Sequence, residues 1–93
     1  MSGAITLPPK LDLRAAGPLR DEILSHAGQD LTLDAGAVTH LGALSLQVIR
    51  AAARSWAMAG RSLTIANVST DLADQLALLG FSADNVTRWE AQP

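Results

Sequence analysis

Residues 31–59, LTLDAGAVTHLGALSLQVIRAAARSWAMA, decide the fold because their hydrophobic pattern changes period part-way along. Leu31, Leu33 and Ala35 alternate with polar residues, and this period of two predicts a strand with one apolar face. From residue 44 the apolar residues recur every three or four positions, which predicts an amphipathic helix over 44–59. The change of period places a turn at 36–43. Because the first N–H groups of a helix lack partners within it, residues 42–45 are expected to attract an anion or acceptor.

The other elements show the same two periods and end at turn-forming residues. In chain order they are a strand at 4–7, a helix from Arg14 or Gly17 to His26, a strand at 62–67, a helix that follows the N-cap Ser69 and ends at Gly80, and a short edge strand within 82–93. The predicted buried stripes are Ala16, Leu19, Ile23 and Ala27 on the first helix and Leu72, Leu76 and Leu79 on the third.

The order of strands and helices predicts the fold class. Short strand–helix connections suit crossover units, which place sequential strands parallel. The strands alternate instead of being apolar throughout, so we expect the helices to gather on one face of the sheet. The sequence therefore predicts a single α/β domain over residues 1–93, a two-layer sandwich with a mixed sheet of four or five strands.

The composition excludes several classes of function. Seven Lys and Arg against nine Asp and Glu give a formal charge of −2, so we expect no binding to nucleic acid. The chain has no cysteine for a disulfide or a thiolate metal site, and residues 1–10 do not resemble a signal peptide. Arg50 and Arg54 interrupt the most apolar stretch, 42–59, which argues against membrane insertion. We expect a cytoplasmic protein without metal or cofactor, monomeric or weakly dimeric, either free or on the cytoplasmic face of a membrane complex.

Few titratable groups are placed to form a catalytic site. His26 and His40 do not have metal-ligand spacing, and the glycine motifs that bind phosphate are absent. We therefore expect a protein that is not an enzyme. The rival interpretation is a small-molecule binder or an enzyme that uses Asp34, Thr39 and His40 beside the helix start. For Asp34 a turn-forming role beside Gly36 is the favoured reading.

Three long side chains of the second helix have alternative explanations. Arg50 and Arg54 lie one helical turn apart and form either a solvated face or a basic patch for an acidic partner. Trp56 lies at helical spacing in the apolar stripe and is expected in the core.

The 31–59 stretch, followed by the strand SLTIANVS and the segment DLADQLALLGF, resembles the STAS domain, the family of bacterial anti-sigma factor antagonists. The family pattern has Asp after a hydrophobic strand, then Val, a hydrophobic residue, and Asp-Ser-[Ser/Thr]-Gly-Leu. It holds well here at Asp34, Val38, Leu41 and Leu46. The resemblance spans about residues 4–81 and implies a sheet backed by helices on one side, with a function in protein–protein regulation.

The departures from the family pattern concern its phosphorylation switch. In that family a Ser or Thr at the position of Ala43 is phosphorylated by a partner kinase, which adds about −1.5 to −2 charges at the helix start. Ala43 has no hydroxyl, Gly42 replaces the preceding Asp, and Ser45 replaces the Gly that the family has two positions after the phosphorylated residue. The resemblance therefore implies docking without the usual switch, with Ser45 or Thr39 as the nearest alternative acceptors.

We expect a protein partner to contact the turn and the start of the second helix. The predicted contact residues are Thr39, His40, Gly42, Ala43, Leu44, Ser45, Leu46 and Arg50. The resemblance implies three kinds of partner. One is a kinase-like anti-sigma factor. A chemotaxis kinase or receptor complex is the second, because LGALSLQV is similar to small STAS proteins found with chemotaxis genes. The third is the ATPase of an Mla-type lipid transporter.

Overall fold

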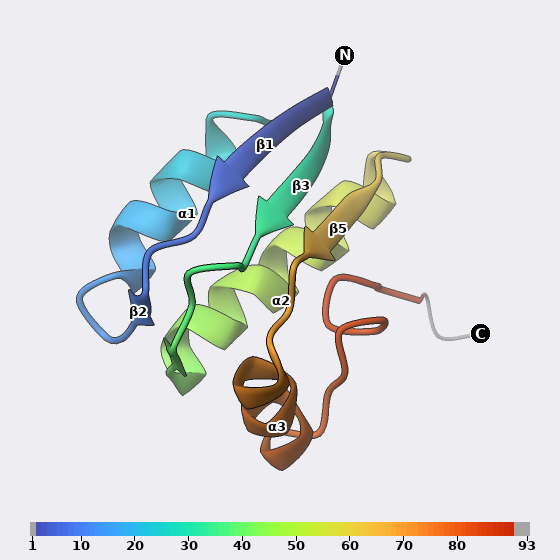
Figure 1. Ribbon diagram of the computed structural model, residues 1–93. Helices are drawn as coiled ribbons and strands as arrows, with labels where there is room; N and C mark the ends of the chain where they lie inside the picture. Colours follow the sequence, from blue (N-terminus) through green and yellow to red (C-terminus); the bar gives the residue numbers. More distant parts are fainter. Residues whose placement is uncertain (1, 91–93) are drawn as a thin grey trace.

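Three parallel strands form the central sheet of the computed structural model, which describes residues 2–90 (Figure 1). Their order is β1-β3-β5, with Ile5 of β1 beside Leu33 of β3 and Leu33 beside Ile65 of β5. The strands are β1 (Ser2–Thr6), β2 (Lys10–Leu11), β3 (Asp30–Asp34), β4 (His40–Leu41) and β5 (Leu63–Ala66), and the helices are α1 (Ala16–Leu24), α2 (Ala43–Met58) and α3 (Thr70–Leu78).

Only one face of this sheet is buried. Ile5 and Leu33 are 2% and 0% exposed, and Leu31 and Leu63 are buried with them beneath α1 and α2. On the opposite face the hydroxyls of Thr32 and Thr64 lie 3.1 Å apart and reach solvent. The alternation therefore gathers both crossover helices on one side, and the predicted two-layer α/β sandwich is confirmed.

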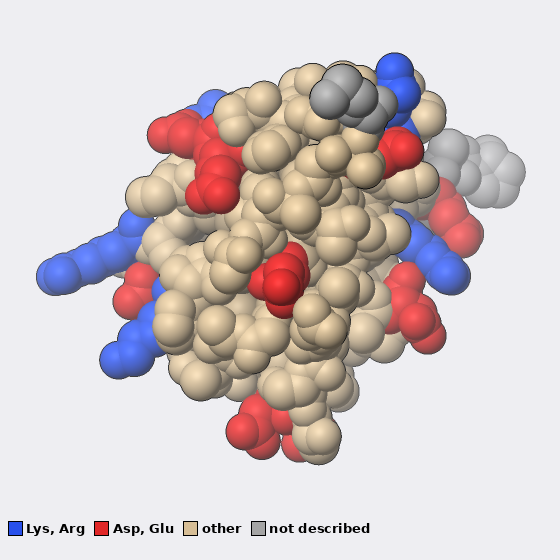
Figure 2. Space-filling view, turned by 45° about the horizontal axis from the view of Figure 1, so that its top comes forward, with Lys and Arg blue, Asp and Glu red and all other residues tan. Residues whose placement is uncertain are grey.

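Charged side chains are sparse over much of one side of the molecule. Figure 2 shows Lys, Arg, Asp and Glu mainly around the margin of this view, with an isolated acidic group near the centre. The basic side chains do not gather into a stripe there, as they would on a surface that tracks a phosphate backbone. This distribution agrees with the small net charge of −2.

A second, two-stranded sheet continues the chain beyond the carboxyl ends of β1 and β3. Lys10 and Leu11 of β2 pair in parallel with His40 and Leu41 of β4. Strands of two residues are too short to show an alternating pattern, so the sequence did not predict this pairing. It ties the 8–12 segment to the turn that precedes α2.

Several sequence expectations are confirmed at the third helix. The Ser69 hydroxyl accepts from the Leu72 N–H at 3.1 Å, as an N-cap does. Gly80 has a φ of 88°, and the Phe81 N–H donates to the Leu76 carbonyl at 2.8 Å, which completes a Schellman ending.

Other expectations need correction. Ala27 and Leu79 are exposed, because α1 ends at residue 24 and Leu79 is the C-cap of α3. All the described strand pairings are parallel, where a mixed sheet was expected. The edge strand predicted within 82–93 is wrong for residues 82–90, which contain turns at 83–87 and no strand, and residues 91–93 lie outside the described chain.

Arg50 explains why the 82–90 segment is not a strand. Its guanidinium Nη1 donates to three carbonyl groups of the 85–88 segment at 2.7 to 3.1 Å, so these carbonyls point at α2 and not along a sheet edge. The same guanidinium lies 4.7 Å from the centre of the Phe81 ring and 5.4 Å from that of Trp89. Arg50 thus anchors the C-terminal segment across α2, and Val86 is fully buried beneath it.

We predict that Arg50→Ala lowers the free energy of unfolding by about 1.5–3 kcal/mol, the usual worth of hydrogen bonds to a charged group. Arg50→Lys should recover only part of this loss, because an ammonium cannot form the planar stack between the two rings. Urea denaturation measures both values, and hydrogen exchange at the Val86 N–H reports release of the segment.

Arg54→Ala is the matched control, because the Arg54 guanidinium lies 5.8 Å from the centre of the Trp89 ring and has no hydrogen bond to any other side chain or carbonyl within residues 2–90. Its loss should stay below about 1 kcal/mol. Equal losses for the two alanine variants would contradict the anchoring role of Arg50.

Candidate functional site

The turn that follows β3 begins with a carboxylate that organises the local backbone. Asp34 Oδ1 accepts from the Gly36 N–H at 2.9 Å and from the Asn67 side-chain amide at 3.1 Å. These two hydrogen bonds favour the charged carboxylate and hold the pKa of Asp34 below its usual value of 3.8. The bond from Gly36 has the larger effect and the bond from Asn67 the smaller one. Asn67 has a φ of 59°, in the left-handed region that Asn tolerates better than most residues. Asp34 is therefore a turn-forming residue, as favoured from the sequence.

Two neighbouring segments hold the rest of the turn. The N–H and the hydroxyl of Thr39 both donate to the Pro9 carbonyl, at 2.7 and 3.1 Å. From α3, the side chain of Gln75 accepts from the Leu41 N–H at 2.8 Å and donates to the Thr39 carbonyl at 2.9 Å. Gln75 could not be predicted from the sequence, since a half-buried Gln on a helix has no characteristic spacing. These contacts hold the backbone of the turn at residues 39 and 41.

The start of α2 has no side-chain cap. Gly42 occupies the N-cap position with extended backbone, φ −86° and ψ 160°, and no acidic residue lies in the first turn. Ala43 is exposed, and Leu44 is 44% exposed. The start of α2 therefore carries a partial positive charge at an accessible surface, with no capping side chain and no acidic residue in its first turn to balance it.

Gly42 also lies against the neighbouring segment. Its N–H donates to the Leu11 carbonyl at 2.8 Å, and a Cβ added at Gly42 would lie 3.1 Å from that same oxygen. This separation is tighter than ordinary van der Waals contact, so a side chain at residue 42 requires the Leu11 backbone to move. The glycine is therefore suited to its place between β4 and α2.

The structure separates the eight predicted contact residues into two groups. Five lie together around the turn and the helix start, and we call them the helix-start surface: Thr39, His40, Gly42, Ala43 and Leu44. The other three do not face this surface. Ser45 is 0% exposed and donates its hydroxyl to the Asp12 carbonyl at 3.2 Å, Leu46 is in the core at 6%, and Arg50 holds the C-terminal segment.

The burial of Ser45 bears on its suggested role as a phosphate acceptor. A hydroxyl with no exposed surface that is already bonded to a backbone carbonyl is out of reach of a kinase in the folded chain. Thr39 is exposed, although its hydroxyl is bonded to Pro9. The structure thus argues against Ser45 and leaves Thr39 as the accessible hydroxyl of the turn.

The three residues of the rival catalytic interpretation have separate roles in the turn. Asp34 bonds Gly36 and Asn67, Thr39 bonds Pro9, and no side-chain hydrogen bond joins either of them to His40. Within residues 2–90, no group of three His, Cys, Asp or Glu side chains is arranged to hold a metal ion. Nor does any helix in this described part have the length and hydropathy of a membrane span.

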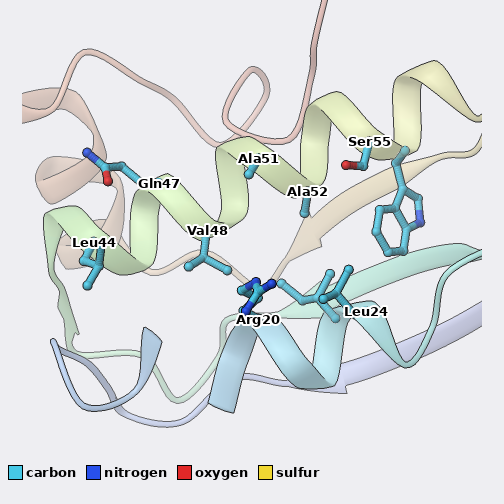
Figure 3. Close-up of a pocket in the computed structure, with 10 residues that line it drawn as sticks. Arg20, Leu24, Leu44, Gln47, Val48, Ala51, Ala52 and Ser55 are labelled. Carbon is cyan, nitrogen blue, oxygen red and sulfur yellow. The ribbon is translucent and has the colours of Figure 1, made fainter. Parts of the chain in front are cut away.

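A groove of about 390 Å³ begins at Leu44 and runs between α1 and α2 (Figure 3). We call it the interhelix groove. Figure 3 shows Arg20 and Leu24 rising from α1, with Val48 directed toward Arg20 from α2. Sequence reasoning missed it, because a groove depends on how two helices are spaced and not on the pattern of either one.

Comparison with known families identifies the fold. A family model described as "Mlab, STAS domain" matches residues 2–87. The chain is a member of the STAS domain family. A search of curated proteins finds no match to it. At the level of the family, a STAS domain is a regulatory binding module of the anti-sigma factor antagonist type and is generally non-enzymatic.

In this STAS domain Ala43 lies where the resemblance places the phosphorylated Ser or Thr, at the exposed first position of α2. The position is accessible but carries no hydroxyl, and the position before it is the closely packed Gly42. Ala43 therefore offers an exposed position at the start of α2 that has no group to accept a phosphate.

Asp34 makes a pH-dependent contribution to this turn. Because its pKa is lower in the folded chain than in the unfolded one, it stabilises the fold above about pH 3.8, and this stability is lost as the pH falls through the folded value. We predict that Asn67→Gly raises the pKa of Asp34 toward 3.8, since glycine keeps the positive φ and only the amide is removed. An NMR titration of the Asp34 carboxyl group measures the change.

Asn85→Ser is the control for this titration, because Asn85 bonds the Ser82 N–H in the C-terminal segment. It should leave the Asp34 midpoint unchanged. An Asp34 midpoint that does not move in Asn67→Gly would show that the amide hydrogen bond has no influence on the carboxylate.

Proposed function

We propose that this STAS domain is a non-enzymatic docking module whose partner contacts the helix-start surface, and that docking there is not controlled by phosphorylation at residue 43. The supporting observation is the exposed and uncapped start of α2, which presents Ala43 and Leu44 on a rigid turn. An exposed leucine beside free helix N–H groups suits a partner with an apolar side chain next to an acceptor or an anion. All three kinds of partner implied by the resemblance would place the chain in the cytoplasm.

The rigidity of the turn supports this proposal. Three different segments hold the turn by hydrogen bonds. The Pro9 carbonyl and the Gln75 side chain accept from backbone N–H groups of the turn, and the Asn67 amide donates to Asp34. A surface that is ordered before binding loses little conformational entropy when a partner arrives. A switchable segment would instead be expected to have few such contacts.

The second candidate is more specific. The matching family model is described by the name Mlab, and this favours a STAS subunit that docks on the ATPase of a lipid-transport ABC system. The regulatory alternative is a kinase-like anti-sigma factor or a chemotaxis kinase. The same surface would contact any of these partners, so the candidate functions are distinguished by identifying the partner.

A photo-crosslinking amino acid in place of His40 tests the docking. His40 is exposed and lies in β4 beside the helix start. In the native host we expect a covalent adduct with one protein, whose identity by mass spectrometry names the partner class. The same amino acid in place of Ala27, an exposed residue just beyond α1, is the control and should give no such adduct. No adduct from His40 would contradict the proposal.

We predict that Ala43→Glu reduces the His40 adduct about tenfold, equivalent to ~1.4 kcal/mol, because it adds bulk and charge at the contact. The fold should be unaffected, since Glu is favourable in the first turn of a helix. Ala27→Glu, with the same charge change away from this surface, should keep the full yield. Phosphopeptide mapping should find Ser45 unmodified, and phosphate there would contradict constitutive docking.

A further inference from the structure

The interhelix groove is an apolar channel with one charged side chain. Leu24 of α1 and Leu44 of α2 are 51% and 44% exposed on its sides, although both are large hydrophobic residues. Ala51 and Ala52 line the α2 side with small side chains, and the buried Trp56 also lines the groove. Large exposed leucines gathered along a groove mark a surface that another molecule covers.

Among the residues that the structure describes, Arg20 is the only charged one that lines the interhelix groove. The positions three and four residues away on α1 hold Ala16, Gly17, Ile23 and Leu24, so no carboxylate lies at the helical spacing that would pair with it. Figure 3 shows its side chain directed across the groove toward Val48. An occupant of the groove would therefore place an acidic group beside Arg20.

The geometry points to a helix as the occupant. The α2 side of the groove extends from Leu44 to Trp56, which at about 1.5 Å per residue is roughly 18 Å, or a little over three helical turns. Its lining residues recur at the three- and four-residue steps that form the ridges of a helix surface. Two parallel rows of such ridges, from α1 and α2, suit the side chains of a third helix.

We propose that the interhelix groove receives an amphipathic helix of the partner protein, with apolar side chains between Leu24 and Leu44 and an Asp or Glu beside Arg20. This inference rests on the proposed function, because Leu44 belongs to both the groove and the helix-start surface. The two surfaces are continuous, and one partner covers both of them. The occupant is a segment of a partner and not α1 of a second copy of this chain. In a second copy the equivalent position is again Arg20, so two positive charges would meet in the groove.

The test places the photo-crosslinking amino acid at Ala51, an exposed residue that lines the groove, in parallel with His40 and the control Ala27. We expect the protein captured from His40 to be captured from Ala51 as well. Mass spectrometry should map the Ala51 adduct to a segment with apolar residues at three- and four-residue steps and an acidic residue among them. Thermal melts of each variant confirm folding.

Charge substitutions at Arg20 test the acidic contact. Arg20→Glu should reduce the Ala51 adduct about tenfold, which corresponds to ~1.4 kcal/mol, while Arg20→Lys should keep most of it. A synthetic peptide of the mapped segment, titrated against wild type and Arg20→Glu, should show the same difference in affinity. Equal affinities would overturn the assignment of Arg20.

The outcomes separate this inference from the proposed function. An adduct from His40 with none from Ala51 overturns the groove while docking at the helix-start surface stands. No adduct from either position overturns both. An Ala51 adduct on a second copy of the chain, or on a segment without helical periodicity, overturns the inferred occupant.

Discussion

The burial of a single face of the β1-β3-β5 sheet is the constraint on which the rest of the structure depends. Each strand places apolar side chains on one side, and burial of that area supplies about 25 cal/mol per Å². Both crossover helices must then cover the same face. Since α2 follows β3 and precedes the parallel strand β5, its first turn lies at the carboxyl edge of the sheet. The position of the helix-start surface is thus a result of how the core is covered.

The surface itself owes its shape to polar contacts and not to the core. Backbone groups of the turn are bonded to Pro9 from one side and to Gln75 from the other, and Asp34 closes the preceding bend. In a mobile loop these backbone N–H and carbonyl groups would be hydrogen-bonded to water instead. With these backbone groups already bonded, the turn presents Ala43 and Leu44 in a defined arrangement.

Elements with their own periodicity could be predicted from the sequence, and contacts between distant segments could not. The α2 helix, the strands beside it, the Ser69 cap and the Gly80 ending all follow from local patterns. The β2–β4 pair and the role of Gln75 depend on segments about thirty residues apart, which leave no local signal.

For the candidate site, the resemblance located the turn and the missing hydroxyl of Ala43, and the predicted contacts of the turn and the helix start stay a prediction. Of these, Thr39, His40, Ala43 and Leu44 are exposed and Gly42 is partly exposed. Ser45 and Arg50 do not lie on the helix-start surface as expected, because their side chains are hydrogen-bonded to backbone carbonyl groups of remote segments. Every residue has a backbone carbonyl, so the sequence does not reveal which carbonyl a distant side chain will bond. Ser45 and Arg50 were therefore expected at the contact surface, whereas they hold segments of the fold together.

The close packing at Gly42 limits which residues can occupy the position before Ala43. A hydroxyl at residue 43 needs only one substitution at an exposed position. The Asp that the resemblance places before it would put its Cβ 3.1 Å from the Leu11 carbonyl, so the β2 backbone would have to shift by a few tenths of an ångström. The close approach that lets the Gly42 N–H donate to the Leu11 carbonyl therefore disfavours any side chain at residue 42.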